Sequence, residues 1–121
     1  MKLLIVDDEV LIRNVIKEYA KLENYEVDEA EDGDAAIEKA LSKDYDVIVM
    51  DIMMPKRDGF SAIREIKKIK DVPVIVLSAR TMEEDKLNGF DLGIDDYVIK
   101  PFSPKELIAR IKAVTKRQKG E

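Results

Sequence analysis

Apolar and polar residues form blocks along the chain that predict strands and helices in regular alternation. Residues 47–50 and 72–77 are apolar runs without polar alternation, typical of strands buried on both faces, as in a parallel sheet. Residues 2–6 and 97–99 predict two further strands. Residues 25–30 alternate only in part, which indicates a less buried strand towards the sheet edge.

Five helices are predicted between and after these strands, because apolar side chains recur there at intervals of three and four residues. The first lies within residues 11–20, the second follows Gly33, and the third runs over 59–69. The fourth begins at a capping box at 81–84 and stops at Gly93, and the last begins at a second capping box at 103–106.

Five β/α units in strict alternation predict an α/β fold with a parallel sheet and helices on both faces. The length of 121 residues suits one domain with a real core. The basic tail, residues 116–121, fits a frayed helix end, with the start of a linker as the alternative.

Composition narrows the chemistry that this fold can carry. Cysteine and histidine are absent, which excludes disulfides, thiolate metal sites and any histidine base, nucleophile or ligand. The net charge of −5 argues against nucleic-acid binding by this chain alone. No apolar run approaches the ~20 residues that span a membrane, so we expect a cytoplasmic protein without membrane contact.

The candidate chemistry lies where the predicted strands end. Asp51 directly follows the buried strand at 47–50, at the sheet edge where open α/β proteins bind ligands. Asp7 and Asp8 follow the first strand, Ser78 the fourth and Lys100 the fifth, so all five side chains should meet at this edge. Taken singly, the first two also suit a helix cap, Ser78 a turn and Lys100 a solvated charge.

Together these groups favour phosphoryl chemistry. Three neighbouring carboxylates need a raised pKa or a cation, and their hard oxygen atoms suit Mg²⁺. A hydroxyl and an ammonium suit an anion, and a carboxylate is a competent phosphoryl acceptor.

Over essentially its whole length the sequence resembles the receiver domain of two-component response regulators. The resemblance is carried by four motifs: Asp7-Asp8, Asp51-Ile-Met-Met-Pro55 with Asp58-Gly59, Ser78-Ala79, and Lys100-Pro101-Phe102. It implies a doubly wound, flavodoxin-like sheet in the order 2-1-3-4-5.

The resemblance also implies residue roles in the site. Asp51 would be the phosphoacceptor and would bind Mg²⁺ with Asp8 and the main-chain carbonyl of Met53, while Asp7 would act through water. Lys100 would pair with the phosphoryl group, and its bond to Pro101 would be cis.

A switch is implied by the same resemblance. The Ser78 hydroxyl would bond to the phosphoryl group, and Tyr97 would then turn inward; the alternative for Tyr97 is an ordinary edge residue. Small Ala79 leaves room for donor and water, whereas Met53 and Arg80 would tune autodephosphorylation.

The C-terminal part is similar to the OmpR/PhoB group of transcription factors, whose receivers dimerise through the fourth helix, fifth strand and fifth helix. The resemblance implies a homodimer formed through this face on phosphorylation. Cross-subunit ion pairs around Ile94, Leu107 and Ala109 would come from Lys86, Asp95, Asp96, Glu106, Arg110 and Arg117. The alternative is a solvated charged face. Candidates for docking a sensor histidine kinase are Leu11, Asn14, Val15 and Glu18.

We therefore expect a phosphorylation-activated signalling switch that controls transcription. The only reactions that we expect it to catalyse are its own phosphoryl transfer and autodephosphorylation. Alternatives are a stand-alone receiver in a phosphorelay, a partner-binding pseudo-receiver, and a Mg²⁺-dependent phosphatase of the haloacid dehalogenase type. The last usually has Asp-x-Asp after the first strand, whereas this chain has adjacent Asp7 and Asp8.

Overall fold

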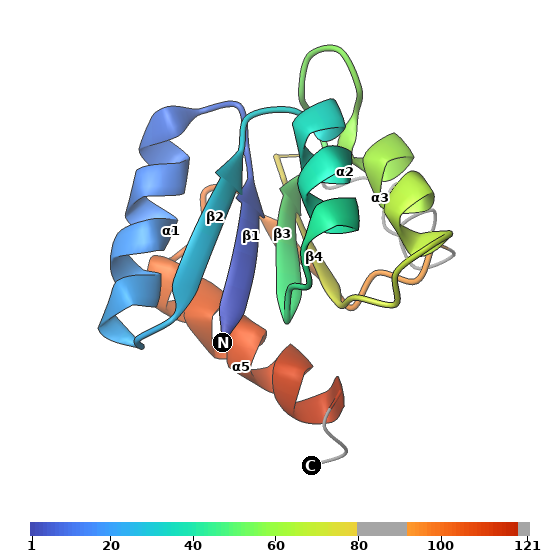
Figure 1. The fold of residues 1–121 in the computed structure, drawn as a ribbon. Coiled ribbons are helices and arrows are strands. Elements are labelled where there is room, and N and C mark those ends of the chain that lie inside the picture. The colour runs from blue at the N-terminus through green and yellow to red at the C-terminus, as the bar shows by residue number, and fades with distance from the viewer. Residues whose placement is uncertain (80–91, 119–121) are drawn as a thin grey trace.

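Five parallel strands form a single sheet in the order β2-β1-β3-β4-β5, which confirms the predicted topology (Figure 1). The computed structural model describes residues 1–79 and 92–118. The strands are β1 (Lys2–Val6), β2 (Glu26–Ala30), β3 (Val47–Asp51), β4 (Val74–Ser78) and β5 (Asp96–Ile99).

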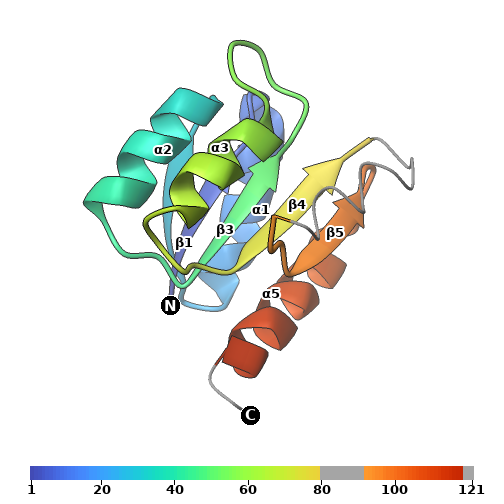
Figure 2. The same ribbon diagram turned by 90° about the vertical axis from the view of Figure 1, so that its right-hand side faces the viewer.

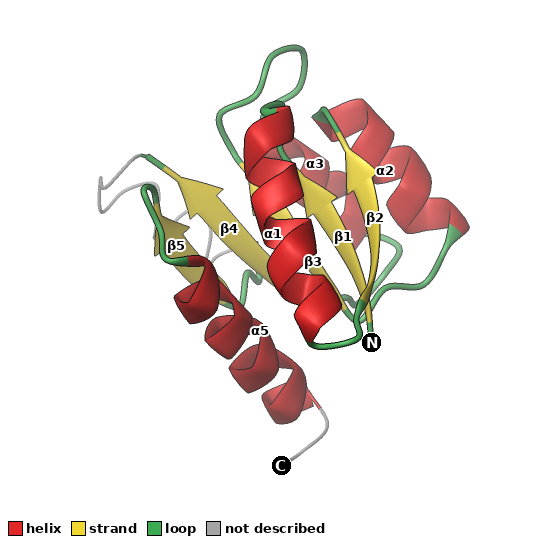
Figure 3. Cartoon of the chain, turned by 90° about the vertical axis from the view of Figure 1, so that its left-hand side faces the viewer, coloured by secondary structure: helices red, strands yellow, loops and turns green. Residues whose placement is uncertain are grey.

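Helices cover both faces of this sheet. The described helices are α1 (Val10–Leu22), α2 (Gly33–Ser42), α3 (Gly59–Lys67) and α5 (Pro104–Gln118). Helices α2 and α3 lie on one face (Figure 2), and α1 and α5 lie on the other (Figure 3). The predicted fourth helix falls on residues 81–91, outside the described part of the chain. No helix in the described part is long and apolar enough to cross a membrane.

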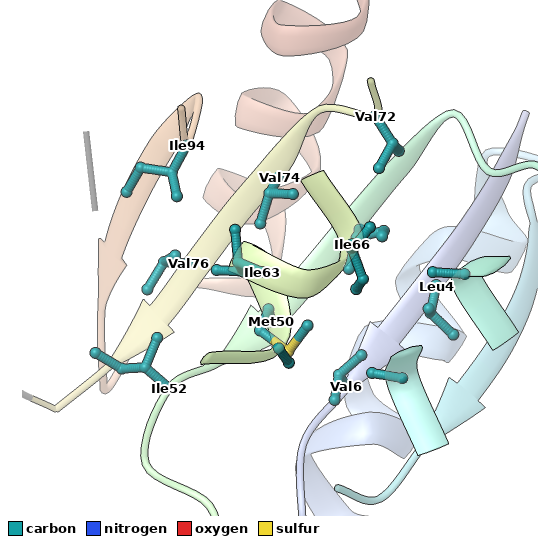
Figure 4. Close-up of a cluster of buried hydrophobic side chains, with 14 of the residues drawn as sticks. Leu4, Val6, Met50, Ile52, Ile63, Ile66, Val72, Val74, Val76 and Ile94 are labelled. Atoms are coloured by element: carbon teal, nitrogen blue, oxygen red, sulfur yellow. The ribbon is translucent and has the colours of Figure 1, made fainter. Parts of the chain in front are cut away.

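Each face of the sheet has its own hydrophobic core. On one face, Met50 and Val74 lie beneath Ile63 and Ile66 of α3 (Figure 4). On the other, alternate strand residues such as Val49 pack with residues of α1 and α5. Strands β3 and β4 are fully buried because they are covered on both sides, which explains their lack of polar alternation.

Two boundaries show local chemistry at work. Strand β4 begins at Val74, two residues later than predicted. Pro73 has no N–H group to donate to a neighbouring strand, so regular pairing starts after it. Its carbonyl still accepts a hydrogen bond from the Ile48 amide at 2.9 Å. Helix α5 begins as predicted, and the Ser103 hydroxyl oxygen accepts a bond from the Glu106 amide at 3.3 Å.

The strand register brings the polar strand ends to one level. Val6 pairs with Met50, so Asp7 lies beside Asp51. Ser78 pairs with Ile99, so Lys100 follows directly after the last paired residue of β5. Hydrogen bonding between parallel strands thus assembles the candidate site from residues far apart in the sequence.

Candidate functional site

Three carboxylates converge at the carboxyl edge of the sheet. Asp7, Asp8 and Asp51 each offer an oxygen atom, and these atoms lie within 4.8 Å of one another. Asp7 is 0% exposed and Asp51 is 2% exposed, whereas Asp8 faces solvent. The predicted convergence of these acids is therefore present in the structure.

Lys100 supplies one positive charge to the cluster. Its Nζ lies 3.0 Å from Asp7 Oδ2 and 3.3 Å from Asp51 Oδ2. Burial opposes the charged form of this amine, but the hydrogen bonds and charges of the two acids outweigh burial and raise the pKa of Lys100. Lys100 is consequently a fixed ammonium of the site and not a solvated charge.

Burial, first of all, raises the pKa of Asp51, and the neighbouring charge of Asp7 adds to the effect. The amide of Met53, which donates to Asp51 Oδ1 at 3.0 Å, and the ammonium of Lys100 act in the opposite direction. Among the described residues, three carboxylates against the one ammonium of Lys100 leave an excess of negative charge. A divalent cation with hard oxygen ligands fits this donor set.

Hydrogen bonds with main-chain groups hold Asp7 in place. Asp7 Oδ1 accepts a bond from the Glu9 amide at 2.9 Å, and the Asp7 amide donates to the Ala30 carbonyl at 3.2 Å. The N-cap of α1 is Glu9, without a side-chain cap bond, so the alternative that the two acids cap this helix is wrong.

Gly59 lets α3 begin directly against the end of β3. A Cβ atom at Gly59 would lie 2.5 Å from the Asp51 carbonyl oxygen and 2.6 Å from Ile52 Cα, closer than real Cβ atoms approach backbone. The Gly59 amide donates to the Ile52 carbonyl at 3.1 Å. This close approach keeps the short loop from Asp51 to α3, which carries Met53, tight against the site.

The proposed switch residues are both buried. Ser78 is 0% exposed at the end of β4, so it is not a surface turn residue. Tyr97 is 9% exposed and packs in the α2–α3 core, so it is not an exposed edge residue either. Tyr97 thus already lies inward, where the resemblance has it turn on phosphorylation. Ala79 is exposed, and Arg80 lies outside the described residues.

An apolar cavity of about 480 Å³ adjoins Lys100. Its lining includes Leu11 and Val15 of α1, 75% and 40% exposed, together with Pro101 and Phe102. Asn14 and Glu18 are also exposed on this helix. The Lys100–Pro101 peptide bond is cis, the isomer that the resemblance implies.

Only some residues of the predicted dimer face are exposed to solvent. Ile94 and Leu107, around which the ion pairs are expected, are 6% and 1% exposed and pack into the cores, whereas Ala109 is exposed. Arg110 binds Asp96 at 2.9 Å and Glu106 at 3.0 Å within the chain.

The other members of that face differ in their surroundings. Asp95 Oδ2 accepts a bond from the Val74 amide at 2.9 Å, and Arg117 is exposed beside a surface hollow of about 580 Å³. Lys86 lies outside the described residues.

Two arginines that support the site were missed by sequence reasoning. Arg13 Nη1 donates to the Asp7 carbonyl at 2.7 Å, and Arg57 Nε donates to Asp34 Oδ1 at 2.6 Å, which braces the loop after Asp51. The sequence contains one weak indication of this role for Arg13, because it places a charged residue about one helical turn after the two acids.

Comparison with known proteins identifies the family. A model of the response regulator receiver domain matches residues 3–112. Transcriptional regulatory protein ResD of Bacillus subtilis (strain 168) is 47% identical over 116 residues, which cover 96% of this chain and 48% of ResD. The chain spans about half the length of the curated relatives it matches.

Two solved structures are also similar to the chain. The receiver domain of Francisella response regulator 1452 is 40% identical, with a TM-score of 0.90 over 97% of this chain and 98% of that one. The receiver domain of sensor histidine kinase PA1611 from Pseudomonas aeruginosa PAO1, solved with magnesium in its active site cleft, is 33% identical, with a TM-score of 0.86 over 95% and 97%. The chain belongs to the response regulator receiver domain family.

Proposed function

We propose that the chain is a phosphorylation-controlled switch that accepts a phosphoryl group on Asp51 from a sensor histidine kinase. The observation that carries the proposal is the placement of Asp51, a buried carboxylate bonded to Lys100 and grouped with Asp7 and Asp8. A nucleophile held beside an ammonium at the carboxyl edge of the sheet suits in-line phosphoryl transfer.

In the transfer, an Asp51 oxygen forms a bond to phosphorus while the phosphorus–nitrogen bond of the kinase phosphohistidine breaks. The electron pair of that bond goes to the imidazole nitrogen, which then takes a proton. Lys100 stabilises the charge on the phosphoryl oxygen atoms, and the Met53 amide orients the carboxylate through Oδ1. Water later attacks phosphorus, which releases phosphate and restores the Asp51 carboxylate.

Asp8, Asp51 and the main-chain carbonyl of Met53 would hold Mg²⁺, with Asp7 acting through water. The support is the cluster of carboxylate oxygen atoms and its excess negative charge. When bound, Mg²⁺ neutralises charge on the phosphoryl group. Among relatives, the PA1611 receiver domain was solved with magnesium in its cleft.

The kinase would dock on the outer face of α1. Leu11 and Val15 line the apolar cavity whose wall also includes Lys100, so a partner seated there is adjacent to the phosphoacceptor. Asn14 and Glu18 provide polar contacts at the rim.

The output would be a homodimer formed through β5 and α5. Ser78 would bond to the phosphoryl group, and Tyr97 would stay inward, which links the site to β5. Arg110, Asp96 and Glu106 would then exchange their internal ion pairs for pairs across the dimer. Because ResD is a transcriptional regulatory protein, we propose that the switch controls transcription as one part of a longer regulator.

Phosphorylation by a small donor tests the acceptor. With acetyl phosphate and Mg²⁺, intact mass spectrometry should detect one phosphoryl group on the wild type and none on Asp51→Asn. Lys100→Met should slow the reaction about 100-fold, because it removes a donor to the transferring oxygen atoms. Asp44→Asn, at an exposed acid before β3, should behave as wild type. A labile acyl phosphate on Asp51→Asn, or multiple turnover of simple phosphate esters, would contradict the proposal.

Stability against pH tests the charge of the site. Because the pKa of Asp51 is raised on folding, its ionised form opposes folding. This cost grows as pH rises from the ordinary pKa of an aspartic acid to the raised pKa, and it is constant above that. Without Mg²⁺, Asp51→Asn should therefore raise the free energy of unfolding at pH 7, with no gain near pH 3. Mg²⁺ should stabilise the wild type far more than the variant. Urea titrations measure both effects; equal stabilisation by Mg²⁺ would argue against Asp51 as a ligand.

Matched substitutions on α1 test kinase docking. Leu11→Asp should lower the rate of transfer from the partner kinase about tenfold or more, since it places a charge in the apolar contact. Leu22→Asp, at a residue 77% exposed on the same helix, is the control. Both variants should react normally with acetyl phosphate. Equal kinase rates for the two variants would place docking elsewhere.

Beryllofluoride tests the dimer. With Mg²⁺ and beryllofluoride, light scattering after size exclusion should shift from monomer to dimer mass, and Arg110→Glu should abolish the shift. Arg64→Glu, at an exposed position on α3, should leave it intact. A persistent monomer in the wild type would refute this output.

A further inference from the structure

Arg13 ties edge strand β2 to the acidic loop after β1. Its Nε donates to Glu29 Oε1 at 3.0 Å, and its Nη1 donates to the main-chain carbonyl of Asp7 at 2.7 Å. We propose that Arg13, anchored by Glu29, is a positioning residue that sets the orientation of Asp8 for Mg²⁺. This inference rests on the proposed function, in which Asp8 is a metal ligand.

The position of the carbonyl that Arg13 contacts explains why Arg13 should orient Asp8. The Asp7 carboxylate is already held by the Glu9 amide and by Lys100. Within residues 1–79 and 92–118, by contrast, the exposed Asp8 carboxylate has no hydrogen bond or ion pair, so the backbone determines where it points. Arg13 bonds to the carbonyl of the peptide unit that joins Asp7 to Asp8, and so restrains the rotation of that unit.

Glu29 gives the arginine a firm anchor. Glu29 belongs to edge strand β2, and its main-chain carbonyl accepts a hydrogen bond from Lys39 Nζ of α2. The Arg13 side chain is only 14% exposed, and that of Glu29 is 31% exposed, so this pair is better shielded than most surface ion pairs.

The planar guanidinium is needed for this geometry. It donates in two fixed directions at once, to a side chain on β2 and to the backbone after β1. A lysine carries the same charge on a single nitrogen atom and would not hold both acceptors in the same way.

Lys17 provides a matched control, because it binds the same Glu29 carboxylate and, in the part of the chain that the structure describes, makes no hydrogen bond to the acidic loop. Affinity for Mg²⁺ alone is measured by NMR titration of the Asp8 and Glu9 amides. Arg13→Gln should weaken binding about tenfold, the lower end of losses seen when partners of metal ligands are removed. Arg13→Lys should also weaken it, whereas Lys17→Gln should change it less than twofold. Urea titrations establish that each variant is folded.

A double-mutant cycle gives the second test. Glu29→Ala should weaken Mg²⁺ binding because it frees Arg13, and adding it to Arg13→Gln should cause no further loss. If Arg13→Gln does not fold, Arg13→Lys and Glu29→Ala take its place. Equal Mg²⁺ affinity in Arg13→Gln and Lys17→Gln, or additive losses in the double variant, overturns the inference alone. Failure of the wild type to bind Mg²⁺ overturns the proposed function as well.

Discussion

The bonds from Lys100 to Asp7 and Asp51 are the constraint on which the rest of the structure depends. Within residues 1–79 and 92–118, one ammonium faces three carboxylates at a largely buried sheet edge, so these groups carry an excess of negative charge. The two cores that cover β3 keep Asp51 there, because the strand cannot move outward without exposing apolar side chains. Excess charge held in a rigid frame is what makes the site receptive to a divalent cation and responsive to modification.

Helix α1 contributes to the site in two ways. Its outer face presents Leu11 and Val15 to the apolar cavity, while Arg13 bonds to the acidic loop. The proposed docking surface and the acidic site are therefore adjacent along one helix. In the proposed function this proximity matters, because the donor would be a side chain of another protein that approaches Asp51 from outside the sheet edge.

Much of the fold was predictable because buried parallel strands leave a strong signature. The apolar runs located β3 and β4, and partial alternation placed β2 at the edge. The polar strand ends then indicated the site, since parallel strands share one carboxyl edge. Pro73 shifted the start of β4 through a missing amide, a detail that apolar periodicity does not contain. The roles of individual residues in chemistry came from the family resemblance and not from the pattern.

The sequence could not show which distant groups the long side chains contact. The bonds from Arg13 and Arg57 depend on how loops and a neighbouring element lie in space. The burial of Ile94 and Leu107 likewise depends on how β5 and α5 pack against the rest of the fold.

A crystal structure of the chain with Mg²⁺ and beryllofluoride tests the central claim most directly. The account predicts beryllium on an Asp51 carboxylate oxygen, a fluoride within hydrogen-bond distance of Lys100 Nζ, and Mg²⁺ bound by Asp8 and Asp51. Beryllofluoride bound to any other residue, or Mg²⁺ held without these two acids, would contradict it.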